Sequence, residues 1–153
     1  MQTVAGLFVL GLMVLLGAGC SSTLPFLTTD DEAEQPHDST LAYSLYLVGD
    51  AGAPRLEPLE PTLKLLGNRL DQEGPNSAVV FLGDNIYTSG MPPSGDPLRE
   101  LSEERIEAQL NTVKGTQSRL IMVPGNHDWG NGGQGGNPAA VRRQERYVEQ
   151  YMD

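Results

Sequence analysis

Residues 77–90 read "SAVVFLGDNIYTSG" and join an apolar run to a polar end made of turn-forming residues. The apolar part has the length and the composition of a buried β-strand. Gly83 then allows the backbone to turn sharply, and Asp84 follows it. Tyr87 comes three residues after Asp84. This stretch predicts a strand that places an aspartate, a common metal ligand, at the edge of a sheet with a tyrosine close by.

Two other stretches repeat this pattern of an apolar run that ends in glycine and an oxygen-bearing side chain. They are "AYSLYLVGD" at residues 42–50 and "RLIMVPGN" at residues 119–126. Helical patterns separate the three runs, so the order of elements is strand, helix, strand, helix, strand, helix. Right-handed crossovers make such strands parallel. The sequence therefore predicts an α/β fold.

The predicted helices are indicated by apolar spacing and by capping residues. The first has an apolar face made of Leu59, Leu63, Leu66 and Leu70. The second lies in residues 101–115, with Ser102 as its N-cap, Gly115 as its stop, and Ile106, Leu110 and Val113 as its buried stripe. The third begins with Asn137 as its cap and Pro138 in its first turn.

Parallel strands bring their carboxyl ends to one edge of the sheet, which is where the ligands of open α/β sheets bind. Asp50, Asp84 and Asn126 would meet at this edge. Their carboxylate and amide oxygens suit hard cations, and one aspartate can bridge two ions. A pair of metal ions activates water and stabilises the charge on a transferring phosphoryl group. The three strand ends therefore predict a metal site for phosphoryl chemistry.

The third strand end continues as "GNHD" and adds two titratable groups. His127 directly follows Asn126, so it would lie near a substrate bound to the metals. A protonated imidazole could stabilise the transition state and protonate the leaving oxygen. Asp128 could orient that imidazole and raise its pKa. We predict catalytic roles for both residues.

Taken together, "GDAG" at 49–52, "GDNIY" at 83–87 and "GNHD" at 125–128 resemble the first three signature blocks of calcineurin-like metallophosphoesterases. They resemble more narrowly the purple acid phosphatase branch, in which the tyrosine of the second block takes the role of ferric ligand. Many other branches carry a histidine two residues after the first aspartate, where this chain has Gly52. The resemblance implies one sheet of a four-layer αββα sandwich, with mainly parallel strands and crossover helices.

The resemblance also implies a role for each matched residue. Asp50 and Tyr87 would bind Fe(III), Asp84 would bridge both ions, and Asn126 would bind a divalent Fe, Zn or Mn ion. His127 would be the acid beside the metals. A free phenol has a pKa of ~10, so a strong Lewis acid is needed to ionise Tyr87 near neutral pH. Fe(III) would do so, whereas Mg(II) or Mn(II) would do so poorly.

The family's two later blocks supply three histidine ligands, but this chain has only His37 and His127. We therefore interpret residues 42–153 as the N-terminal half of a metallophosphoesterase domain. We expect phosphomonoesterase activity from the intact protein, little activity from these 153 residues alone, and an exposed apolar sheet face. One alternative is a phosphodiesterase or protein phosphatase of the same superfamily that uses Mn, Zn or Mg. Another is a non-catalytic surface lipoprotein or gene remnant.

The N-terminal region carries an export pattern. Residues 3–19 are uncharged and end in small residues, which is typical of a signal peptide, here residues 1–19. "LLGAGC" resembles the lipobox of bacterial lipoproteins and implies a lipidated Cys20, a membrane anchor and an outer-membrane or cell-surface location. The alternatives are an ordinary secretory signal, which would give a periplasmic or secreted protein, and a short anchor helix. Residues 20–41 are polar and proline-containing and read as a flexible tether. The formal net charge of −10 argues against a nucleic-acid partner.

Overall fold

The computed structural model describes residues 41–130 and 136–153. All of them belong to the second of two compact units, which spans His37–Asp153. The predicted signal peptide, Cys20 and almost all of the tether lie outside the described residues. Within the described ranges, no helix has the length and apolar character needed to cross a bilayer.

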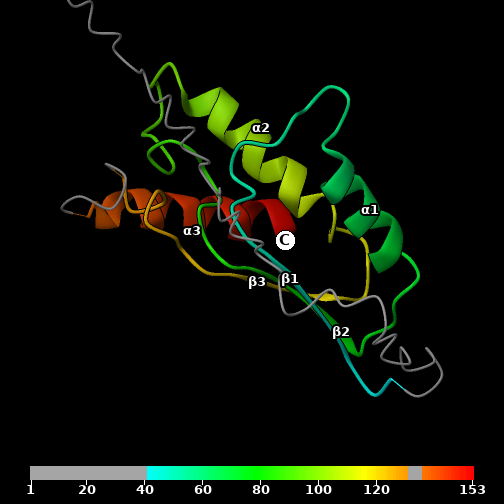
Figure 1. The fold of residues 1–153 in the computed structure, drawn as a ribbon. Coiled ribbons are helices and arrows are strands. Elements are labelled where there is room, and N and C mark those ends of the chain that lie inside the picture. Colours follow the sequence, from blue (N-terminus) through cyan, green and yellow to red (C-terminus); the bar gives the residue numbers. More distant parts are fainter. Residues whose placement is uncertain (1–40, 131–135) are drawn as a thin grey trace, which may run out of the picture. The chain divides into compact units, whose positions relative to one another are not determined.

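The fold is a three-stranded parallel sheet with helices between and after the strands (Figure 1). The elements are β1 (Ser44–Val48), α1 (Pro61–Leu70), β2 (Ser77–Phe81), α2 (Arg99–Leu110), β3 (Arg119–Met122) and α3 (Pro138–Met152). The strands lie in the order β1-β2-β3, and both neighbouring pairs are parallel. The predicted α/β class and the alternation of strands and helices are confirmed.

The core lies between one face of the sheet and the helices. Side chains alternate between the two faces of a strand, so Val79 and Phe81 of β2 point to the same side. Both are fully buried and pack against Leu63, Leu66 and Leu70 of α1. A second cluster joins Ile106 and Leu110 of α2 to residues of α3. Figure 1 shows α1 and α2 on this side of the sheet.

The opposite face of the sheet is apolar and exposed. Leu45 and Leu47 of β1 expose 57% and 60% of their surface, and Ile121 of β3 exposes 48%. Isolated exposed leucines are ordinary, but a contiguous apolar sheet face is not. The expectation of an exposed apolar sheet face is confirmed for the described residues.

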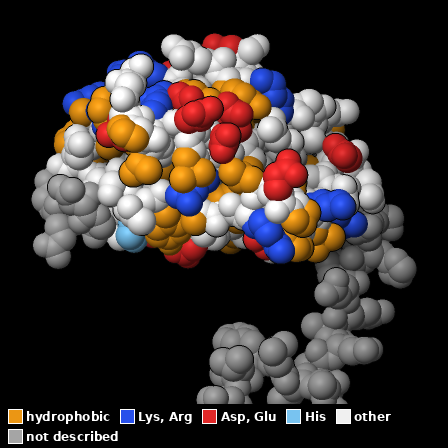
Figure 2. Space-filling model, turned by 90° about the horizontal axis from the view of Figure 1, so that it is seen from above, with side chains coloured by type: hydrophobic (Ala, Val, Ile, Leu, Met, Phe, Trp, Pro, Cys, Tyr) orange, Lys and Arg blue, Asp and Glu red, His pale blue; other side chains and the backbone are white. Residues whose placement is uncertain are grey.

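Charges are mixed on the molecular surface seen in Figure 2. Basic side chains lie singly or in small groups there, among acidic and apolar side chains.

Three details of the predicted helices are wrong. The second helix ends at Leu110, so the buried Val113 and the predicted stop Gly115 lie in the turn that follows it. Leu59 precedes α1 and is 37% exposed, because the helix begins only at Pro61. Ser102 does not cap α2, because the helix begins one turn earlier at Arg99 and the Ser102 hydroxyl donates to the carbonyl oxygen of Leu98. In α3 the prediction is confirmed, since the Asn137 side chain accepts a hydrogen bond from the N–H of Ala139 at 3.1 Å.

Candidate metal centre

The three strands end in register at one edge of the sheet. Val48 pairs with Phe81, and Phe81 pairs with Met122, so the last residues of the strands form one row. Asp50, Asp84 and Asn126 follow this row by two, three and four residues. The structure therefore brings the three predicted strand-end ligands to the same edge, as the parallel topology requires.

Both aspartates have backbone conformations that are rare for residues with a side chain. Asp50 has a φ of 55° and Asp84 has a φ of 52°. The left-handed region costs an L-residue ~1–2 kcal/mol, although aspartate tolerates it better than most. Two such residues at neighbouring strand ends indicate a site where the turn geometry is held for a purpose other than stability.

Tyr87 joins the two aspartates. Its hydroxyl oxygen lies 2.9 Å from Oδ1 of Asp50 and 3.2 Å from Oδ2 of Asp84. The hydrogen bond to Asp50, partial desolvation and the hydrogen bond to Asp84 together raise the pKa of the Tyr87 phenol to about 12. Three oxygens thus converge on one point, where the Tyr87 hydroxyl has a carboxylate acceptor on either side.

His127 lies against this cluster. Its backbone N–H donates to Oδ1 of Asp84 at 2.9 Å, and its ring meets the Tyr87 ring edge-on with centroids 4.5 Å apart. Nδ1 lies 2.7 Å from the carbonyl oxygen of Thr88. Because a carbonyl oxygen can only accept, Nδ1 carries a proton, and Nε2 is the nitrogen left for proton exchange.

Asn126 is exposed and is placed by its neighbours. On one side of it, a Cβ built on Gly125 would lie only 2.3 Å from Oδ1 of Asp84. On the other side, the N–H of His127 bonds to the same oxygen. The backbone on both sides of Asn126 therefore lies against Asp84, and metal binding by the Asn126 side chain stays a prediction.

Asp128 has partners other than the predicted one. Its carboxylate is fully buried and accepts from the backbone N–H groups of Asn85, Ile86 and Gly125 at 2.8–3.0 Å. Burial raises the pKa of this carboxyl, and the backbone donors oppose the rise. The imidazole of His127 bonds instead to Thr88. In this structure Asp128 therefore holds backbone, not the imidazole, and its catalytic role remains a prediction.

Glycines allow the motif loops to pack backbone against backbone. A Cβ on Gly52 would lie 2.3 Å from the carbonyl oxygen of Asp84, and one on Gly83 would lie 2.7 Å from Cα of Gly125. Gly52 also accepts a hydrogen bond from the N–H of Tyr87 at 3.0 Å. The position at which other branches carry histidine is thus filled here by the backbone of the tyrosine-bearing loop.

Sequence reasoning missed three polar residues that support this loop. Arg105 of α2 donates to the carbonyl oxygen of Tyr87 at 2.8 Å. Gln109, also on α2 and fully buried, donates to the carbonyl oxygen of Asn85 at 2.8 Å. Asn85 in turn donates to the carbonyl oxygen of Val123. Gln109 could have been found from the sequence, because it is a polar residue beside the predicted buried stripe of the second helix.

The donor set fits a hard cation. In residues 41–130 and 136–153, no three His, Cys, Asp or Glu side chains form a group that could hold a metal ion. The convergent set is instead two carboxylates and one phenol oxygen, each within hydrogen-bonding distance of another. Oxygen donors of this kind suit Mg, Mn, Ca or Fe(III) better than a soft ion.

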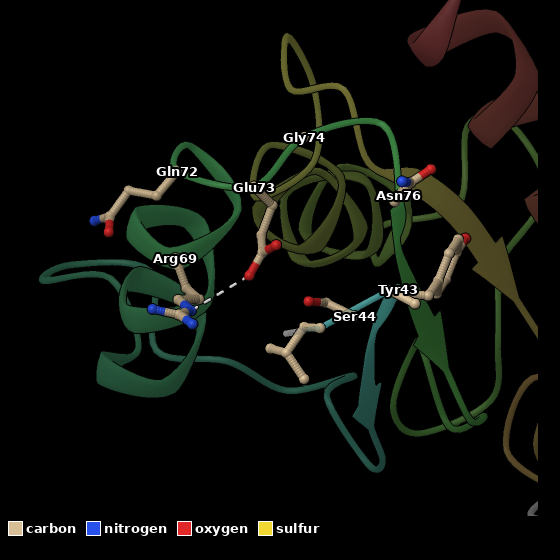
Figure 3. Close-up of a pocket in the computed structure, with 9 residues that line it drawn as sticks. Tyr43, Ser44, Arg69, Gln72, Glu73, Gly74 and Asn76 are labelled. Carbon is tan, nitrogen blue, oxygen red and sulfur yellow. Dashed lines mark ion pairs between the residues drawn. The ribbon is translucent and has the colours of Figure 1, made fainter. Parts of the chain in front are cut away.

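Two cavities differ in their relation to this centre. One of about 240 Å³ adjoins it and is lined by Tyr87, Thr88, Leu98, Leu101 and Arg105 among others. Another of about 320 Å³ lies at the amino-terminal ends of β1 and β2, beside the Arg69–Glu73 ion pair (Figure 3). The second cavity is at the opposite end of the strands and has no part in the metal centre.

Comparison with known proteins identifies the family. A model of the calcineurin-like phosphoesterase family matches residues 43–152. The chain therefore belongs to the calcineurin-like phosphoesterases, which are metal-dependent hydrolases of phosphate esters. The parallel sheet with its helices is consistent with part of that family's fold. No curated protein and no solved structure matches the chain.

Proposed function

We propose that the chain supplies metal ligands for the hydrolysis of phosphate monoesters at a two-metal site of the purple acid phosphatase type. The observation that carries this proposal is the contact of the Tyr87 hydroxyl with both Asp50 and Asp84. An ordinary phenol has a pKa of ~10, so a strongly acidic ion is needed to displace its proton near pH 7. This requirement favours Fe(III) at the tyrosine.

In this proposal each residue has a defined task. Asp50 and Tyr87 would hold one ion, Asp84 would contribute to both ions, and Asn126 would hold the divalent ion. When bound, the ions supply an activated water and neutralise charge on the phosphoryl oxygens. His127, with Nδ1 fixed on Thr88, delivers a proton from Nε2 to the leaving oxygen.

Visible absorbance of the iron-loaded chain tests the ferric assignment. A ferric phenolate absorbs in the visible, and Tyr87→Phe removes the phenolate while leaving the rest of the ring in place. We expect a band in the wild-type chain that is lost in Tyr87→Phe. Iron that binds without colour would reject the tyrosine ligand and favour a Mn, Zn or Mg enzyme of the same family.

Hydrolysis of an aryl phosphate by the intact protein tests the reaction itself. We expect His127→Gln to lower kcat by ~10²–10⁴-fold without changing metal content, because the imidazole acts on the leaving group and not on the ions. An unchanged kcat in this variant would remove His127 from the mechanism. Cleavage of a diester in preference to the monoester would contradict the substrate class.

We also propose that the protein is exported and anchored by lipid on Cys20. The support is the uncharged segment 3–19 followed by "LLGAGC". Metabolic labelling with a fatty acid tests this in a bacterial host. We expect label on the wild-type chain and none on Cys20→Ser, whereas equal labelling of the two would exclude lipidation at this residue.

A further inference from the structure

Asp128 is surrounded by hydrogen-bond donors from two different loops. Its Oδ2 accepts from the N–H of Gly125 at 2.8 Å and from Nδ2 of Asn85 at 3.1 Å. Its Oδ1 accepts from the N–H of Ile86 at 3.0 Å, and the N–H of Asn85 is shared between both oxygens at 3.0 Å. The side chain is fully buried, so no solvent competes for these donors.

These donors are the immediate neighbours of the proposed metal ligands. Asn85 directly follows Asp84, and Gly125 directly precedes Asn126. One loop follows β2 and the other follows β3, so the carboxylate joins the ends of two strands. Loss of this link would leave the two loops joined by fewer bonds, chiefly the bond from the His127 N–H to Asp84 and the bond from Asn85 to the Val123 carbonyl oxygen.

The joined loops are also tied to the rest of the fold. Asn85 donates from Nδ2 to the carbonyl oxygen of Val123 at 2.8 Å, and Gln109 of α2 donates to the carbonyl oxygen of Asn85 at 2.8 Å. The contacts of Asp128 with the two loops, hereafter the Asp128 clamp, are therefore attached to the end of β3 and to α2. Both are more rigid supports than a loop.

We propose that Asp128 is a positioning residue that fixes the distance between the Asp84 and Asn126 ligands by holding the two loops together. This inference rests on the proposed function, because only a metal site requires a fixed distance between these two ligands. It also places the residue's action on ligand geometry and not on the proton of His127. Removal of residues that orient metal ligands typically lowers metal affinity by ~10–100-fold.

Asp128→Asn in the full 153-residue chain is the test variant. The amide keeps the size of the side chain but turns one acceptor into a donor that faces backbone N–H groups. Asp71→Asn is the matched control, because it makes the same chemical change at an exposed residue at the end of α1. Amide hydrogen exchange and amide proton shifts are measured by NMR in the metal-free proteins, and affinity for Fe(III), Mn(II) and Zn(II) is measured by titration.

We expect exchange at the Asn85, Ile86 and Gly125 amides to accelerate at least tenfold in Asp128→Asn, with Val79 of β2 unchanged. We also expect the ion that the wild-type chain binds most tightly to bind at least tenfold more weakly. Asp71→Asn should match the wild type in both measurements. If Asp128 only stabilised the fold as a whole, Asp128→Asn would accelerate exchange at core amides such as that of Val79 as much as at Asn85, Ile86 and Gly125.

Unchanged exchange at the three amides would overturn the proposal, and so would faster exchange with metal affinity within twofold of the wild type. If Asp128→Asn does not fold, Asn85→Ala replaces it, since it removes one donor to the carboxylate and should give a smaller change of the same kind. No change in Asn85→Ala would then overturn the clamp. A wild-type chain that binds none of the three ions would instead reject the proposed function. In that case the amide exchange rates alone would show whether Asp128 holds the two loops together.

Discussion

The two glycines of "GDAG" should differ sharply in their tolerance of a methyl group. A Cβ on Gly52 would lie 2.3 Å from the carbonyl oxygen of Asp84 and 2.6 Å from the backbone nitrogen of Ile86. Real Cβ atoms essentially never approach closer than 3.0 Å, so the backbone would have to shift by about 0.7 Å, the difference between 3.0 and 2.3 Å. A Cβ on Gly49 meets nothing within 4 Å.

Overpacking of a close-packed region costs ~1–3 kcal/mol. The atoms that Gly52→Ala would displace are backbone atoms of the loop that carries Asp84, so we expect a loss of ~2–3 kcal/mol in the free energy of unfolding. At ~4 °C for each kcal/mol in a domain of this size, the midpoint of thermal unfolding should fall by roughly 10 °C. Gly49→Ala should stay within ~0.5 kcal/mol of the wild type.

Urea unfolding followed by circular dichroism, with thermal melts on the same samples, measures both variants. A Gly52→Ala chain as stable as the wild type would refute the close backbone approach. A Gly49→Ala chain that loses as much as Gly52→Ala would show that the cost comes from loss of glycine's conformational freedom and not from the contact with Asp84.

Three further predictions concern other parts of the chain. Ultraviolet titration of the metal-free protein should show Tyr87 ionising near pH 12, and Asp50→Asn should lower this pKa because the Asp50 hydrogen bond is its main cause. The folded-state pKa of Tyr87 exceeds the ordinary value of 10.0, so the phenol should stabilise the fold fully below pH 10 and lose this contribution as the pH rises towards 12. A dependence of stability on pH identical to that of Tyr87→Phe would contradict this prediction. Asn137→Ala should lower the free energy of unfolding by ~1 kcal/mol through loss of the α3 cap, as measured by urea unfolding, and no loss would mean that the cap is not formed in solution. Leu47→Glu, on the exposed sheet face, should change stability by less than ~0.5 kcal/mol but reduce self-association in analytical ultracentrifugation, whereas unchanged association would show that this face makes no contacts between chains.

Much of the fold could be read from local pattern because it depends on local physics. Three apolar runs, each ended by glycine, predicted β1, β2 and β3, and leucine spacing predicted the buried face of α1. Parallel pairing then followed from the helical crossovers that connect the strands. The start of α2 was misplaced because the serine that looked like a cap lies inside the helix and bonds to Leu98.

The candidate site was predicted in part for a similar reason. Asp50, Asp84 and Asn126 follow strands, and the register of parallel strands brings such positions to one edge. The partners of Asp128 could not be read in the same way. Adjacent residues in a loop can point in different directions, so its nearness to His127 in the sequence suggested a contact that the structure does not make.

The sequence by itself determined the class of fold, the edge of the sheet that carries the site, and the chemistry of the oxygen donors. These follow from composition, periodicity and the order of elements, which are properties of the chain read along its length. Only the tertiary structure decided that Tyr87 lies between two aspartates, that Gly52 is required by a crossing backbone, and that Asp128 holds two loops together. Each of these depends on residues far apart in the sequence meeting within about 3 Å, and such distances are set by packing and not by the local pattern of residues.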